Sequence, residues 1–191
     1  MAIEPDTKDW TWVMERSCPA CGFDPSTVRR AEVAERIAAS SAGWDGVLAD
    51  RAARERPDDG TWSPLEYACH VRDVHDLMRE RLGLMLSYDE SASGGATFAN
   101  WDQDATATEE RYHAQDPAVV ARELAAAAAA FAGAYRAVDD GQWQRKGLRS
   151  NGSTFTVASF AAYALHDLEH HRVDVGLPAR PAAETQEESH G

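Results

Sequence analysis

The feature that most constrains the fold is a set of four long segments in which apolar side chains recur every three or four positions. Asp-Pro or Ser-Pro pairs precede the first three, and Gly176 and Pro178 end the fourth. The periodicity predicts helices over about 25–53, 64–86, 117–138 and 157–175. Four long helices with short connections favour an all-α four-helix bundle, with a long crossover between helices two and three.

The start of the second predicted helix is the sharpest of these signals. Ser63-Pro64-Leu65-Glu66 reads as a capping box, in which the Ser63 side chain accepts from the Glu66 amide and the Glu66 carboxylate reaches back. Pro64 suits the first helical position because its missing N–H has no partner there in any case.

Two connections between the helices carry their own signals. Residues 87–115 are polar, with a short helix expected around 100–112 and no obvious strand; a connection of this length is often functional. Asn151-Gly152 predicts a tight hairpin before the last helix. The chain therefore divides into an arm over 1–24, which packs through Trp10 and Trp12, the bundle over 25–177, and a disordered tail over 178–191.

The charge balance limits the partners. The net charge of −13 repels phosphate backbones and anionic lipid surfaces, so nucleic acid and membranes are not expected as partners. The N-terminus has no signal-peptide pattern, and no stretch approaches the roughly 20 apolar residues of a membrane span. We expect a cytoplasmic protein, monomeric or homodimeric, that acts on a small molecule.

The stretch LHDLEHHRVD holds three histidines on the last predicted helix. His166 and His170 are four positions apart, which puts both imidazoles on one face, where they can chelate a divalent cation. His171 is rotated by about 100° from His170 and is not expected to share that face. His70, on the second helix, can join the pair if these two helices are neighbours. An incidental pair, or buried imidazoles held by hydrogen bonds, is the alternative.

At this point the sequence resembles a known family. WSPLEYACH is similar to the W-S-x-x-E-x-x-x-H segment of the DinB-like (YfiT-like) four-helix-bundle metalloproteins, and HDLEHH is similar to the H-x-x-x-H of their last helix. The resemblance covers roughly residues 25–176. It implies that His70, His166 and His170 bind one divalent metal, with open positions for water or substrate.

Three neutral imidazoles leave the full charge on such an ion, which activates water or a thiol. The resemblance therefore favours a transferase that activates a low-molecular-weight thiol. The alanine- and arginine-rich composition is typical of a high-GC genome, where that thiol would be mycothiol. The alternatives are a hydrolase on the same site and a non-catalytic metal-binding stress-response module. Zinc is the expected metal because imidazole suits it, while nickel and iron accept the same ligands.

Several further residues are candidates for the surroundings of this site. Glu66, Asp73 and Asp167 could orient the ligands, although a helix cap explains Glu66, and solvated surface charge is the default for the other two. Asn100 and Trp101, in the crossover, are pocket candidates.

Cys18 and Cys21 form a CxxC motif that the resemblance does not cover. Such a pair is half of a zinc site or a redox dithiol, but no second CxxC is present to complete the zinc site. A structural role, or a site completed by a distant residue or a partner chain, remains open.

Overall fold

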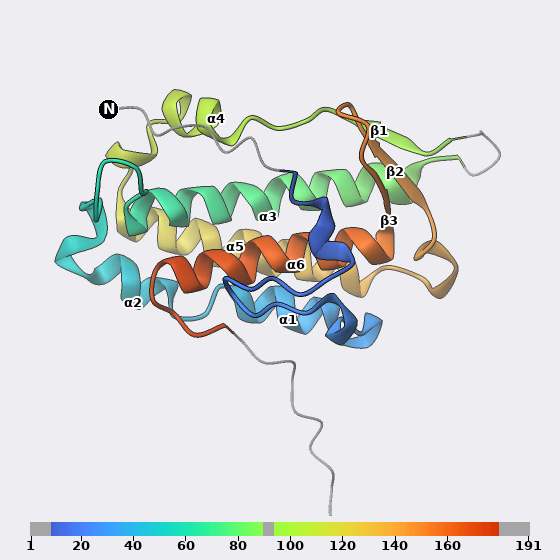
Figure 1. Cartoon of the computed structure of the whole chain (residues 1–191), viewed down its shortest axis with the longest axis horizontal. Helices are drawn as coiled ribbons and strands as arrows, with labels where there is room; N and C mark the ends of the chain where they lie inside the picture. The colour runs from blue at the N-terminus through green and yellow to red at the C-terminus, as the bar shows by residue number, and fades with distance from the viewer. Residues whose placement is uncertain (1–8, 90–93, 180–191) are drawn as a thin grey trace, which may run out of the picture.

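The computed structural model describes residues 9–89 and 94–179 and contains the predicted bundle (Figure 1). Its four main helices are α1 (Val33–Ser40), α3 (Pro64–Ser87), α5 (Pro117–Arg136) and α6 (Val157–Asp174). α5 packs on α1 and α3, and α6 packs on the same two helices from the other side. The all-α prediction is confirmed, and α3 and α6 are neighbours, as a shared site between them requires.

The capping box at the start of α3 forms as the sequence predicts. The Glu66 amide donates to Ser63 Oγ (3.3 Å), and the Ser63 amide donates to Glu66 Oε2 (2.9 Å). Arg56 adds a guanidinium that donates to the same carboxylate. These bonds hold the first turn of α3, the turn that precedes His70.

The first predicted helix is broken, which corrects the sequence-based expectation of one segment over 25–53. Short 3-10 turns at Pro25–Thr27 and Arg30–Glu32 precede α1, and α2 (Trp44–Ala49) and a turn at Arg51–Arg54 follow it. The break lies at Gly43, which has a left-handed φ of +88°. Only glycine adopts this conformation without strain, so the helix stops there.

The crossover contains a strand that the sequence did not reveal. β1 (Ala96–Phe98) pairs in parallel with β2 (Lys146–Arg149), which pairs antiparallel with β3 (Thr154–Thr156). The β2–β3 hairpin turns at Asn151-Gly152 as predicted, with Gly152 at a φ of +95°. α4 (Gln103–Glu109) and a 3-10 turn at Tyr112–Ala114 complete the crossover, and a further turn lies at Asp140–Gln142.

α5 is long and apolar enough by composition to span a membrane, which the sequence-based expectation overlooked. Its apolar character comes mainly from alanine, and its buried face, including Val120, Leu124 and Phe131, packs against α3 and α1. A buried helix of a bundle has these same properties.

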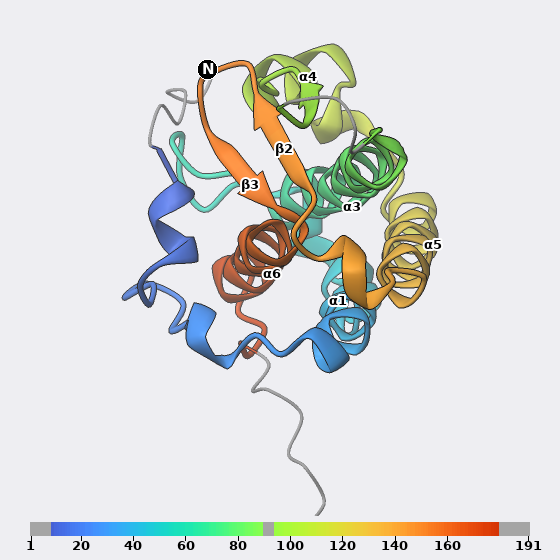
Figure 2. The ribbon, with the colours of Figure 1, turned by 90° about the vertical axis from the view of Figure 1, so that its right-hand side faces the viewer.

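The arm lies across α6, on the side away from α5 (Figure 2). Its 3-10 turn Thr11–Met14 packs on α6, and Val13, Cys18 and Phe23 are buried. α6 is therefore covered by α1, α3 and the arm, and polar side chains such as His166, Glu169 and Arg172 are buried on it. Residues 1–8 of the predicted arm and 180–191 of the predicted tail lie outside the described residues.

Candidate metal centre

α6 carries two pairs of metal-binding side chains on adjacent faces. His166 and His170 form one pair, and Asp167 and His171 form the other, each four positions apart. Because the second pair is rotated by about 100° from the first, the two pairs face different elements. One ligand atom of each of Asp167, His171 and His70 lies within 4.8 Å of the others. His166 and His170 instead gather in the same way with Cys18 and Cys21 of the arm.

The first cluster joins α3 to α6. Asp167 Oδ1 lies 3.4 Å from His70 Nε2 and 3.4 Å from His171 Nε2. Ligand atoms about 2.0–2.1 Å from a tetrahedral zinc ion lie about 3.4 Å from one another. The spacing of the carboxylate and the two imidazoles therefore fits one small divalent cation between them.

The hydrogen bonding of this cluster is incomplete. Both ring nitrogens of His70 and the Oδ1 of Asp167 are buried without a hydrogen-bond partner. Buried polar atoms are nearly always paired, so convergent unpaired atoms indicate a missing binding partner. The residues present thus fit a cation in both spacing and donor type.

The charge states of His70 and Asp167 also suit the binding of a cation. Burial lowers the pKa of His70, so its imidazole is neutral at pH 7 and offers a lone pair. Burial acts to raise the pKa of Asp167, but contact with His70 and the nearby imidazole of His171 outweighs it and holds the pKa well below its usual range. The cluster therefore offers the carboxylate of Asp167 and the neutral imidazole of His70.

Aromatic rings surround His70 and His171. The Trp101 ring stacks on His70 at 5.3 Å and 8°, and the Trp62 ring lies 5.2 Å from it. Tyr67 lies 5.3 Å from His171. His70 is fully buried, whereas the Asp167 and His171 side chains are 23% and 18% exposed. The exposed part of this cluster therefore lies at the side chains of Asp167 and His171.

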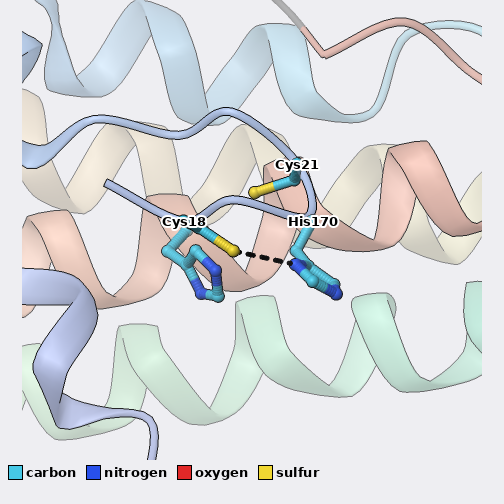
Figure 3. Close-up of side chains that lie close together, drawn as sticks. Cys18, Cys21 and His170 are labelled. Atoms are coloured by element: carbon cyan, nitrogen blue, oxygen red, sulfur yellow. Dashed lines mark hydrogen bonds between the residues drawn. The ribbon is translucent and has the colours of Figure 1, made fainter. Parts of the chain in front are cut away.

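The second cluster joins the arm to α6 (Figure 3). Cys18 Sγ lies 3.8 Å from His170 Nδ1, and all three cysteines of the chain are free thiols. Burial lowers the pKa of His166 to about 4 and raises the pKa of the Cys21 thiol to about 12. The imidazole is thus neutral at pH 7, and the thiol would ionise there only beside a cation.

The structure therefore does not bring His70, His166 and His170 together as the resemblance implied. The three lie in two clusters, and the pair that faces α3 is one position further along α6. Sequence reasoning passed over His171 as a ligand and treated Asp167 as a supporting residue. The spacing of Asp167 and His171 was a signal for both, because it equals that of His166 and His170.

The remaining candidates take different places. Glu66 is held by the cap and Arg56, and Asp73 accepts from Arg72 (2.8 Å) and from the Tyr112 hydroxyl. The backbone amide of Asn100 donates to Ser150 Oγ (2.8 Å) in the hairpin turn, so this bond does not involve the Asn100 side chain. Trp101 alone of these four stacks on a residue of the first cluster.

Comparison with known proteins is consistent with the fold. The family model of the DinB superfamily matches residues 30–174. Among solved structures, YfiT from Bacillus subtilis aligns with a TM-score of 0.60 and 19% sequence identity, covering 75% of this chain and 80% of that one. YfiT is described as a probable metal-dependent hydrolase with an unusual four-helix bundle topology. Among curated proteins, no sequence matches this chain.

Proposed function

Because the chain belongs to the DinB superfamily, we propose that it is a metal-dependent enzyme whose catalytic cation is bound by His70, Asp167 and His171. The observation that carries the proposal is the convergence of three ligand atoms, two of them buried without hydrogen-bond partners. Three protein ligands leave coordination positions for water or substrate, which is typical of catalytic rather than structural zinc sites.

The ligand set favours hydrolysis over thiol transfer. Two imidazoles and one carboxylate are the ligands of zinc hydrolases, whereas the transferase expectation rested on the family resemblance. The description of YfiT as a probable metal-dependent hydrolase supports the same choice. A bound divalent cation would supply Lewis acidity that activates water for attack on a polarised carbonyl or phosphoryl group.

The residues of the chain would prepare this chemistry. His70 is held in place by Trp101 and Trp62, so its orientation is fixed before a ligand binds. Trp62, Tyr67 and Trp101 also place apolar rings beside the cluster, which would strengthen electrostatic interactions there. Zinc is the proposed cation, and Fe²⁺ is the alternative because it also uses two histidines and a carboxylate.

The test compares His70→Ala with wild type in metal content and in turnover of a panel of activated carboxylic and phosphoric esters. We expect His70→Ala to lose one equivalent of metal and about 100-fold or more of the activity, as removal of a principal electrostatic group does. His75→Gln is the matched control, because His75 is a buried histidine of the same helix that bonds Val71 and Ser40. Retention of both metal and turnover in His70→Ala would exclude this site.

The same assay separates the two reaction classes. Turnover that proceeds without added thiol supports hydrolysis. Turnover that requires a low-molecular-weight thiol, mycothiol among those tested, would restore the transferase expectation.

A further inference from the structure

We propose that Cys18, Cys21, His166 and His170 form a second metal site, a closed Cys2His2 zinc site that fastens the arm to α6. It is separate from the proposed catalytic centre and shares no ligand with it. The proposal answers the question left by the CxxC motif, because the two missing ligands come from a helix about 150 residues away in the chain.

The donor atoms have the spacing that zinc requires. One ligand atom of each of the four residues lies within 4.8 Å of the other three. Zinc–sulfur and zinc–nitrogen bonds of about 2.3 and 2.0–2.1 Å place these atoms about 3.6 Å apart in a tetrahedral site. The 3.8 Å from Cys18 Sγ to His170 Nδ1 agrees with that value (Figure 3). His166 Nε2 is buried without a hydrogen-bond partner, as an unfilled ligand position would be.

The loop that carries the cysteines is shaped for thiolate ligands. The Cys18 amide donates to the Phe23 carbonyl, and the Gly22 amide donates to the Cys18 carbonyl, both at 2.8 Å. Gly22 has a φ of +76°, so the chain turns back directly after the second cysteine. The Phe23 amide hydrogen-bonds the Cys21 sulfur, an interaction that stabilises a thiolate.

The surroundings indicate a structural rather than a catalytic ion. Cys18, Cys21 and His166 are 2%, 8% and 5% exposed. The Trp10 ring lies 5.5 Å from both His166 and His170, and Phe23 lies 5.5 Å from His166 on another side. Four protein ligands under aromatic cover leave no position for a substrate.

A cation in this Cys2His2 site would also affect the geometry of the proposed catalytic centre. His166 and His170 alternate along α6 with Asp167 and His171, so a cation bound by the first pair would reinforce the rotation of α6 about its axis that the Arg36–Glu169 ion pair already supports. That rotation directs Asp167 and His171 toward His70. We therefore expect the arm to support the catalytic centre without contacting its cation.

The experiment is a cobalt titration of the metal-free full-length protein, followed by absorption spectroscopy. The second site contains sulfur and the first does not, so thiolate-to-cobalt charge-transfer absorption in the near ultraviolet reports on the second site alone. We expect wild type to bind two equivalents and to develop the band. His70→Ala should bind one equivalent and keep the band.

Two variants complete the test. The double variant Cys18→Ser, Cys21→Ser should lose the band and one equivalent of cobalt, whereas Cys69→Ala, which removes a buried thiol outside both clusters, should keep both. The wild-type titration does not depend on whether the variants fold. Wild type that binds cobalt without the charge-transfer band, or that shows a Cys18–Cys21 disulfide by mass after purification with a reductant, would overturn the proposal.

Discussion

At the residue scale, His75 shows what a buried histidine of this bundle does when it binds no metal. Its Nδ1 lies 2.7 Å from the Val71 carbonyl, and its Nε2 lies 3.1 Å from Ser40 Oγ, so it ties α3 to the end of α1. Burial lowers its pKa to about 4, below the roughly 6.5 of an exposed imidazole. As the pH falls, the unfolded chain takes up this proton before the folded one does.

This difference predicts how His75→Gln changes the pH dependence of stability. The contribution of His75 is full above about pH 6.5 and is lost as the pH falls toward about 4. The excess stability of wild type over His75→Gln should therefore shrink by about 2 kcal/mol between pH 7 and pH 5. Urea unfolding of both proteins at each pH measures it, and the comparison cancels contributions of the other histidines. A difference that stays constant with pH would mean that His75 titrates normally.

The candidate metal ligands show where residue-level prediction stopped. The sequence assigned one candidate ligand, His70, to the second long helix and two, His166 and His170, to the last, and both helices form. It joined His166 and His170 to His70, whereas the pair that faces α3 is Asp167 with His171, because the two pairs differ only by the rotation of α6 about its axis. That rotation is set by long-range contacts, such as the buried ion pair of Glu169 with Arg36 at 2.7 Å, which no local pattern reveals.

At the element scale, the contact between the small sheet and α3 depends on Gly147 of β2. A Cβ at this position would lie 2.7 Å from Phe98 Cε1 and 2.9 Å from Met85 Sδ. We expect Gly147→Ala to lower the free energy of unfolding by about 1–3 kcal/mol, because the ring and the methionine must move.

Gly133 of α5 provides the matched control. It lies in a helix, and a Cβ there meets no atom within 4 Å. Gly133→Ala should therefore raise the free energy of unfolding by about 0.5–1 kcal/mol, since alanine loses less conformational entropy in a helix. Thermal unfolding of the two variants beside wild type measures the opposite shifts. Equal effects of the two substitutions would show that the sheet does not pack tightly on α3.

The long helices were predictable from the sequence, whereas the short strand and the break in the first helix were not. α3, α5 and α6 were found to within a few residues, because each is long, periodic and marked by Pro or a capping residue at its start. β1 was missed because three residues carry too little periodicity, and it forms only by pairing with β2, about 50 residues later. To predict the break at Gly43, one would need to know that its φ is positive, and a glycine in a helical pattern does not show this by itself.

At the scale of the whole molecule, α6 is the element on which the other parts converge. α1, α3 and the arm each contribute a charged or metal-binding side chain that meets it: Arg36, His70, and Cys18 with Cys21. If both cations bind, three connections between distant parts of the chain depend on one helix. Unfolding would then be expected to require the release of both ions, so that stability and metal content fall together.

The distribution of charge leads to the last prediction. The net charge is −13, and several arginines are already engaged with acidic groups or carbonyls. Arg72 bonds Asp73 (2.8 Å) and Glu123 (2.7 Å), and Arg172 donates to the Ser40 carbonyl (2.9 Å). The net negative charge therefore repels phosphates.

We therefore expect no binding of the protein to duplex DNA or single-stranded RNA, even at low ionic strength, where electrostatic attraction is strongest. Fluorescence anisotropy of labelled oligonucleotides, titrated with the metal-loaded protein in about 50 mM salt, measures this. Metal is added because divalent cations bound at the two proposed sites would make the net charge less negative, so the metal-loaded protein gives the more demanding test. Anisotropy that rises with protein and falls on addition of salt would show a local basic surface that the net charge conceals.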